Sequence, residues 1–231
     1  MSIRTCRPIE DFAAVMQLWE RCLGRQYPVS ERVFCQATAG RPNYDPDDAV
    51  VAVEGGKIVA FAMLELLREG TRVREHAAVT AVLVDPDYRR RGLAARMLNQ
   101  LEDVARRAGA TYITVGAGKH RFWTGLPQDL PDARAFFEKQ GYAVEAESVD
   151  LVVPLGNFAS TLKYQDRLAA IQAWVEPATL PHLSAALAFE IREFPKWVDS
   201  MLRMIAAGDM GNVLLVRTKE QIVGTIQTFT P

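Results

Sequence analysis

A cluster of arginines followed by a glycine is the part of this chain best suited to bind an anion. It reads Arg89-Arg90-Arg91-Gly92-Leu93-Ala94-Ala95 and follows an apolar, β-rich run at residues 79–84. A helix that begins here has unpaired first amides and presents the positive end of its dipole. Gly92 lets a ligand approach the backbone closely. The pattern predicts a turn that cradles a diphosphate, and the alternative is a solvated basic turn before an ordinary helix.

The elements on both sides of this turn follow from the spacing of apolar residues. From Leu93 to Ala105 apolar side chains recur with helical periodicity opposite a polar face. Gly109 is placed to end this helix, and residues 111–115 form a second β-rich run. We therefore expect a strand, the turn, an amphipathic helix and another strand, which hold the turn between sheet and helix.

The chain before the turn predicts three further strands and two helices. The strands share short, apolar, β-rich runs, and they cover residues 3–7, 49–53 and 58–64. One helix begins at Pro8 and stops at Gly24, and the other runs from an N-cap at Ser30 to about Thr38. Residues 68–76 are interpreted as a charged connector to the central strand.

The chain after residue 115 opens with a long loop of glycines, aromatic residues and basic residues at positions 116–127. This composition suits a lid or the rim of a substrate site, and it equally suits a loop fixed to the core by Phe122 and Trp123. A short helix is predicted at residues 131–140. Strands are expected from residue 142 and at residues 149–153.

Composition and charge narrow the class of protein. The 231 residues are 49% apolar and 24% charged, with a net charge of −1, which suits one or two globular domains and argues against a nucleic-acid partner. The longest apolar runs fall short of the roughly 20 residues that span a bilayer, so no membrane partner is expected. The three cysteines lack paired spacing and the N-terminus lacks a signal-peptide core, so we expect a cytoplasmic location. Cysteines and histidines show no metal-ligand spacing, so no metal is expected.

Two segments resemble the GNAT superfamily of acyl-CoA-dependent N-acetyltransferases. The family signature is Gln or Arg, two residues, Gly, one residue, then Gly or Ala, which Arg89, Gly92 and Ala94 satisfy. A second segment, Ala133-x-x-Phe136-Phe137-Glu138-Lys139-Gln140-Gly141-Tyr142, is similar to another family pattern. Two positions depart from that pattern, because Leu130 replaces the usual Asn and Phe137 replaces a Tyr that often protonates the departing CoA thiolate.

The resemblance implies an α/β (α+β) chain with the GNAT fold, in which helices flank a mixed, mostly antiparallel sheet. It also implies acetyl-CoA as cosubstrate, with the pantetheine arm paired along the central strand and the diphosphate on the arginine turn. The residues expected to hold acetyl-CoA lie on the strand, the turn and the later helix: Val82, Leu83, Val84, Arg89, Arg90, Arg91, Gly92, Leu93, Ala94, Ala95 and Phe136.

The reaction implied is transfer of an acetyl group from acetyl-CoA to a primary amine of a small molecule or peptide by direct attack. Candidate catalytic residues are Glu75 and His76, as bases just before the central strand, and Tyr142 as a fallback acid. The alternative is that Glu75 and His76 are exposed residues of the connector without a catalytic role. Contacts to the acceptor are expected from the helical corner and the long loop: Tyr27, Glu31, His120 and Trp123. The rival hypothesis is a degenerate GNAT fold that binds acyl-CoA or a partner without turnover.

The C-terminal half repeats the N-terminal half in outline. A short run ending in proline, two helical stretches and two apolar runs recur at residues 171–177, 183–191, 197–207, 213–216 and 222–226. We predict a GNAT domain at 1–156, a polar, helical linker at 157–170 and a partial second GNAT-like domain at 171–231. Convergence on a common arrangement is the alternative. A half-domain leaves an edge and an apolar face uncovered, so we expect it to dock on the first domain or to pair protomers in a homodimer.

Overall fold

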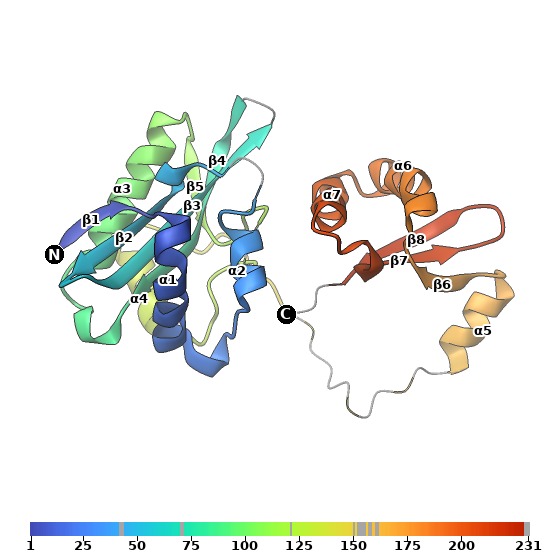
Figure 1. The fold of residues 1–231 in the computed structure, drawn as a ribbon, viewed down its shortest axis with the longest axis horizontal. Coiled ribbons are helices and arrows are strands. Elements are labelled where there is room, and N and C mark those ends of the chain that lie inside the picture. The colour runs from blue at the N-terminus through green and yellow to red at the C-terminus, as the bar shows by residue number, and fades with distance from the viewer. Residues whose placement is uncertain are drawn as a thin grey trace. The chain divides into compact units, whose positions relative to one another are not determined.

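The fold is that of a computed structural model of the 231-residue chain. The structure describes residues 1–41, 44–69, 72–120, 122–149, 151, 156, 159 and 162–228. The chain divides into two compact units, residues 1–150 and residues 151–230 (Figure 1). Each unit has its own sheet, so each is described by itself.

The first unit is built on a five-stranded sheet in the order β1-β2-β3-β4-β5. The strands are β1 (Ser2–Thr5), β2 (Ala49–Glu54), β3 (Lys57–Glu69), β4 (Arg72–Val84) and β5 (Tyr112–Val115). Neighbours from β1 to β4 pair antiparallel, and β5 pairs parallel to β4. The expected mixed, mostly antiparallel sheet is therefore confirmed.

One expectation within this sheet is wrong. Residues 68–76 do not form a connector, because β3 continues to Glu69 and β4 begins at Arg72. Charged residues can occupy strands when the two strands of a hairpin pair with each other, since pairing satisfies the backbone whatever the side chains are. The Arg68↔Val73 and Glu69↔Arg72 pairs extend the hairpin in this way.

Helices cover both faces of the sheet (Figure 1). They are α1 (Pro8–Leu23), α2 (Glu31–Ala37), α3 (Leu93–Arg107) and α4 (Pro131–Lys139), with short 3-10 turns at Gly24–Gln26, Pro46–Asp48 and Pro86–Tyr88. On one face Leu18 and Phe34, from α1 and α2, pack on Phe61 of β3. On the other face Met97 and Leu101 of α3 join the second core. The apolar spacing of the helices accounts for both layers.

The start of α2 is fixed by a side-chain cap. Ser30 accepts a hydrogen bond from the Val33 amide at 3.2 Å, as expected of an N-cap serine. This cap ties down the helical corner that carries Phe34 into the core.

Replacing the cap should weaken the first unit measurably. We expect Ser30→Ala to lower the free energy of unfolding by about 1 kcal/mol, because the Val33 amide loses its acceptor. Urea denaturation measures the change. Ser30→Asp retains an acceptor and is expected to stay near the parent value, so equal losses in both variants would contradict a capping role.

The strands expected after α4 do not form within the described residues. Residues 142–149 are extended without a sheet partner, and all but Tyr142 are exposed. The carboxylates Glu145 and Glu147 alternate with small or polar residues, so this segment has little apolar surface to bury against β5. Thr124 and Ser148 share a hydrogen bond of 2.8 Å between their hydroxyls. Most of the strand expected at 149–153 lies outside the described residues.

The second unit is a smaller three-stranded antiparallel sheet in the order β6-β7-β8. Its core contains Phe189, Met201, Met204 and Leu215. Its elements are α5 (Leu162–Ala170), β6 (Trp174–Pro177), α6 (Leu183–Glu193), α7 (Val198–Ala206), β7 (Val213–Arg217) and β8 (Ile222–Gln227), with 3-10 turns at Leu180–His182, Pro195–Trp197 and Met210–Asn212.

The second unit repeats the element order and strand register of the first. β6-α6-α7-β7-β8 follows the order of β1-α1-α2-β2-β3. The pair Leu214↔Ile226 takes the place of Val50↔Ala62, and the pairs two residues further along correspond as well. This correspondence supports an incomplete second copy, which stays a prediction.

None of the described helices combines the length and the apolar character that crossing a membrane requires.

Candidate active site

Strand β4 separates from β5 halfway along its length. Val79↔Val115 is the last pair between them, and the Gly116 amide donates to Val79 O at 2.8 Å. Beyond this point residues 80–84 of β4 have β3 on one side only. The β3–β4 register skips Thr80, so this residue forms a bulge, and its hydroxyl donates to Met63 O at 3.3 Å. Because a bulge bends its strand, Thr80 marks where the two strands part.

The parting exposes backbone groups of β4. The Asp85 amide donates to Val59 O of β3 at 2.9 Å. Backbone groups alternate along a strand, so Val84 and Val82 turn theirs to the opposite edge. Val84 O there accepts from Cys22 Sγ at 3.3 Å and from Arg89 Nε at 3.1 Å. Val82 has no strand beside its amide and carbonyl among the described residues. An extended ligand could pair at Val82.

The arginine turn lies directly after this open edge. Gly92 is the N-cap of α3 with φ 74°, and Arg90 also has a positive φ of 64°. The first hydrogen bond into the helix runs from the Arg96 amide to Gly92 O at 3.1 Å. The amides of residues 93–95 precede it and have no acceptor within the described part of the chain. These amides, at the positive end of the helix dipole, can bind phosphate oxygens.

The space beside the turn is open. A Cβ placed on Gly92 would meet no protein atom within 4 Å, so the backbone there is open to a ligand. The backbone strain at Arg90, a non-glycine residue, is of the kind that clusters at binding sites. We call the turn, the start of α3 and the open strand edge together the donor surface, because its unpaired backbone groups could bind an extended anionic ligand.

Most of the residues predicted to hold acetyl-CoA lie at this surface, and Leu83 and Phe136 do not. Arg89 reaches back to Val84 O, and Arg91 donates to Asp87 O at 2.8 Å while lying over the Tyr88 ring. Arg90 is exposed. Leu83 is not brought to the open edge, because its backbone faces β3 by alternation and its side chain is in the core. Phe136, half-buried on α4, packs against the core that contains α3.

A buried acidic residue and a histidine form a pair on the face covered by α1 and α2. Glu65 of β3 continues the inward alternation of Phe61 and Met63. Its Oε2 accepts from the His120 amide at 3.0 Å, and its Oε1 contacts His120 Nδ1. The two side chains are 4% and 8% exposed. We call Glu65 and His120 the buried dyad.

The buried dyad lies against β4 where it leaves β5. A Cβ on Gly118 would collide with Glu65 Oε2 and meet Ala78 Cβ at 3.3 Å and Thr80 Cγ2 at 3.4 Å. The carboxylate therefore lies over the bulge. Burial raises the pKa of Glu65, but hydrogen bonds from His120 outweigh burial and hold the pKa below its usual value. Glu65 is thus a carboxylate, and its partner atom Nδ1 carries the hydrogen.

Of the three predicted catalytic residues, His76 interacts with the Glu65 carboxylate, whereas Tyr142 packs with the core on the other face of the sheet. The Glu75 side chain is exposed and its carbonyl accepts from the Thr111 amide. His76 stacks on Tyr112 at 4.4 Å, its Nε2 lies 2.8 Å from Thr114 Oγ1, and burial lowers its pKa. Tyr142 donates to Glu102 at 2.8 Å, and burial followed by this carboxylate raises the Tyr142 pKa. The Tyr142 hydroxyl proton is therefore engaged by the Glu102 carboxylate of α3.

An open cavity of about 1260 Å³ lies beside the long loop and is lined in part by Tyr27 and Trp123. Trp123 stacks on Trp19 of α1 at 5.4 Å, so the loop is fixed to the core and forms a rim as well. The Tyr27 hydroxyl contacts Asp129, and burial followed by this carboxylate raises the Tyr27 pKa to about 12. Glu31 is exposed on α2 and does not line this cavity.

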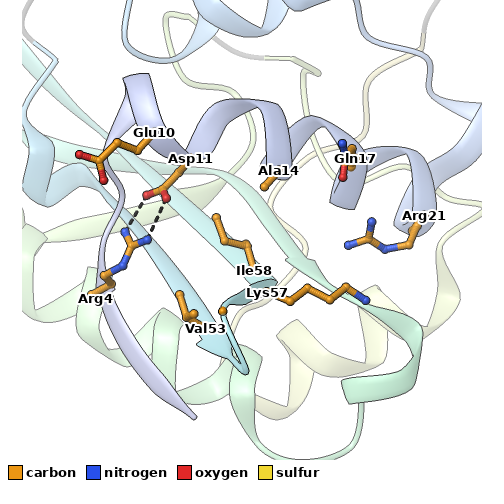
Figure 2. A pocket seen from close by; sticks show the side chains of 10 residues that line it. Arg4, Glu10, Asp11, Ala14, Gln17, Arg21, Val53, Lys57 and Ile58 are labelled. Atoms are coloured by element: carbon orange, nitrogen blue, oxygen red, sulfur yellow. Dashed lines mark hydrogen bonds and ion pairs between the residues drawn. The ribbon is translucent and has the colours of Figure 1, made fainter.

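A second, smaller cavity of about 190 Å³ is lined by several charged residues, among which Figure 2 shows the pair of Arg4 and Asp11. Arg4 grips Asp11 with two hydrogen bonds of 2.6 and 2.8 Å, which joins β1 to α1. Arg21 and Lys57 both bind Asp85, at 2.9 and 3.1 Å. Because each cation has a carboxylate partner, this cavity reads as a structural junction.

Glu65 is the one residue of the site that the sequence reasoning missed. It stands inside an apolar run, Phe61-Ala62-Met63-Leu64-Glu65-Leu66, two residues after Met63, which faces the core. A carboxylate at an inward position needs a buried partner, which was the available signal. The partner, His120, comes from a loop whose path the sequence does not predict.

With this geometry in place, the chain can be compared with known proteins. Residues 12–142 match the model of the acetyltransferase (GNAT) family, which covers more than half of the chain. The chain therefore belongs to the acetyltransferase (GNAT) family, a class of acyl-transferring enzymes. Acetyltransferases of Pectobacterium atrosepticum and Sodalis glossinidius are each 35% identical to it over 103 residues, which is 44% of this chain and 65% of each relative.

A solved structure resembles the whole chain. It is a GCN5-related glucosamine N-acetyltransferase region of a fungal multi-domain GH3 β-N-acetylglucosaminidase, with a TM-score of 0.78 and 21% identity. The match covers 97% of this chain and 27% of the fungal one. At this identity the likeness shows the fold alone, for the second unit as for the first.

Proposed function

We propose that this chain transfers an acetyl group from acetyl-CoA to a primary amine. The observation that carries the proposal is the donor surface, in which the open edge of β4 at Val82 runs into the free amides that follow Gly92. Acetyl-CoA supplies an activated acyl thioester. The β4 edge orients its pantetheine arm, the turn binds its diphosphate, and the Val82 amide is positioned to polarise the thioester carbonyl.

The acceptor side supports an amine substrate. The large cavity is bordered by carboxylates, among them Asp129, Glu145 and Glu147, and Arg134 of its lining is paired with Glu138 at 2.9 Å. Such a border favours a cationic group, and an alkyl ammonium is the form of a primary amine at neutral pH. Its aromatic wall, formed by Phe122 and Trp123, favours the apolar face of a ring or side chain.

Two further assignments stay proposals. We place acetyl-CoA binding in the first unit alone, because the second unit has no counterpart of β4 and α3 among its described residues. We also interpret the second unit as an incomplete second copy with a structural role. On its outer sheet face Val175 and Ile226 are 48% and 53% exposed, so no helix among the described residues covers them as α3 covers the first sheet.

The proposal is tested by binding and turnover of the full chain. We expect acetyl-CoA to bind in a calorimeter and to release free thiol when an amine is added. The amine panel contains glucosamine, an aminoglycoside and a peptide with a free N-terminus, since amines of these kinds are distinct in size and charge. Binding without thiol release for every amine would favour the rival hypothesis of a non-catalytic acyl-CoA-binding module. Absence of binding would contradict both.

A further inference from the structure

We propose that His120, held by Glu65, is the base that takes the proton of the acceptor amine. This inference rests on the proposed function and deepens it by naming the catalytic residue. Glu65 acts through His120 and is a positioning residue. Both side chains are polar, and yet both are buried. They lie at the point where the donor surface begins.

The position of the buried dyad suits the reaction. Glu65 Oε2 lies over Ala78 and Thr80, and Thr80 is the bulge residue where β4 leaves β5. An acyl group on the open edge next to Val82 would therefore lie close to the imidazole. His120 is followed in the same loop by Phe122 and Trp123, which line the large cavity. The loop of His120 thus borders the acceptor cavity, while the His120 side chain itself is 8% exposed and lies outside the cavity lining.

The hydrogen bonds of the dyad leave one nitrogen for chemistry. Nδ1 is engaged by the carboxylate of Glu65, which fixes the tautomer and the orientation of the ring. Nε2 of His120 has no hydrogen-bond partner among the residues that the structure describes. A neutral imidazole in this tautomer carries its lone pair on Nε2, so this atom can accept a proton.

The charges around the dyad come from several elements. Arg41 donates to Leu64 O at 2.8 Å, next to Glu65, and its positive charge helps to lower the Glu65 pKa. Arg41 is itself paired with Asp48 at 2.7 Å. His76 of β4 lies close enough to interact with the Glu65 carboxylate, and Lys119 precedes His120 in the loop. The ionised Glu65 is thus the acidic group in direct contact with His120.

The acceptor ammonium gives one proton to His120 Nε2, and the free amine attacks the thioester carbonyl. The new C–N bond forms and the C–S bond breaks, with its electron pair left on the CoA sulfur. The second nitrogen proton goes to this thiolate through water, which gives the amide and free CoA. His120 then returns its proton to solvent, so the net products are amide, thiol and one proton.

The decisive experiment compares His120→Gln with His182→Gln in the full chain. His182 of the second unit also lies near a carboxylate, Glu176, at 3.5 Å, so it is a matched histidine outside the site. We expect His120→Gln to lower kcat by about 100-fold with acetyl-CoA affinity unchanged, since general bases contribute roughly 10²–10⁴-fold. We expect His182→Gln to retain the parent kcat.

Two further readouts separate a base from a structural residue. Added imidazole should restore part of kcat to His120→Ala. Glu65→Gln keeps an acceptor for the hydrogen on Nδ1, so we expect it to retain more of kcat than Glu65→Ala. A parent enzyme that turns over while His120→Gln keeps more than half of kcat would overturn this inference and leave the proposed function intact. A large loss in His76→Gln with none in His120→Gln would do the same. No amine-dependent thiol release from the parent chain would overturn both.

Discussion

Gly92→Val is expected to weaken acetyl-CoA binding by about 100-fold or more. A Cβ at this position points into the space beside the turn, where no protein atom lies within 4 Å. The valine would therefore occupy the place proposed for the diphosphate. Losing one or two hydrogen bonds to a charged group costs about 3 kcal/mol, and about 1.4 kcal/mol corresponds to tenfold in affinity. Isothermal titration calorimetry with acetyl-CoA measures the change.

The same helix supplies the control for backbone strain. Gly109, just beyond the C-terminal end of α3, also has a positive φ of 93° and no atom within 4 Å of an added Cβ. Gly109→Val therefore carries comparable left-handed strain at the end away from the turn. We expect it to lose similar stability and to keep its affinity for acetyl-CoA. Equal affinity in Gly92→Val and the parent chain would contradict the diphosphate assignment.

Arg41→Met is expected to lower the free energy of unfolding by about 3–5 kcal/mol. Arg41 and Asp48 are each 2% exposed, and the guanidinium also donates to Leu64 O. Removing the cation takes the Arg41 ion pair away from the buried Asp48 carboxylate, and breaking a buried pair by removing one partner is costly. Urea denaturation followed by circular dichroism measures the loss.

The double variant Arg41→Met/Asp48→Asn tests the reason for that loss. It removes the buried negative charge as well, and a neutral amide costs less to bury than a carboxylate. We expect the double variant to recover about 1–3 kcal/mol relative to Arg41→Met. A double variant no more stable than the single one would show that the loss arises from packing of the Arg41 side chain. The negative charge of Asp48 would then not be the cause of the loss.

Local patterns predicted most of the first unit. The amphipathic spacing from Leu93, the proline at the start of α1 and the cap at Ser30 each act within a few residues, so they are legible in one sequence. The pairing of residues 68–76 was missed because strand pairing can override side-chain polarity. The strand expected at residue 142 was over-predicted, since the alternating Glu145 and Glu147 leave the segment little apolar surface to bury beside β5.

The candidate site likewise has a part set by local sequence and a part set by long-range contacts. The arginine turn was predictable because its residues are contiguous, and strand and helix define its geometry. The buried dyad joins Glu65 to a residue 55 positions later, through a loop. Loop paths depend on tertiary contacts, here the packing of Phe122 and Trp123 on Trp19, which no short pattern encodes. His120 was expected near the acceptor, and its carboxylate partner was visible only in three dimensions.

The bulge at Thr80 has a consequence for the life of the protein in the cell. Beyond it, residues 80–84 of β4 have no strand on the side of β5 among the described residues. If acetyl-CoA fills that gap as proposed, the metabolite serves as a removable structural part of the folded state. A ligand at 100 times its Kd stabilises a fold by about 2.7 kcal/mol. The resistance of this protein to unfolding and proteolysis would then follow the supply of acetyl groups, which couples its abundance to carbon metabolism.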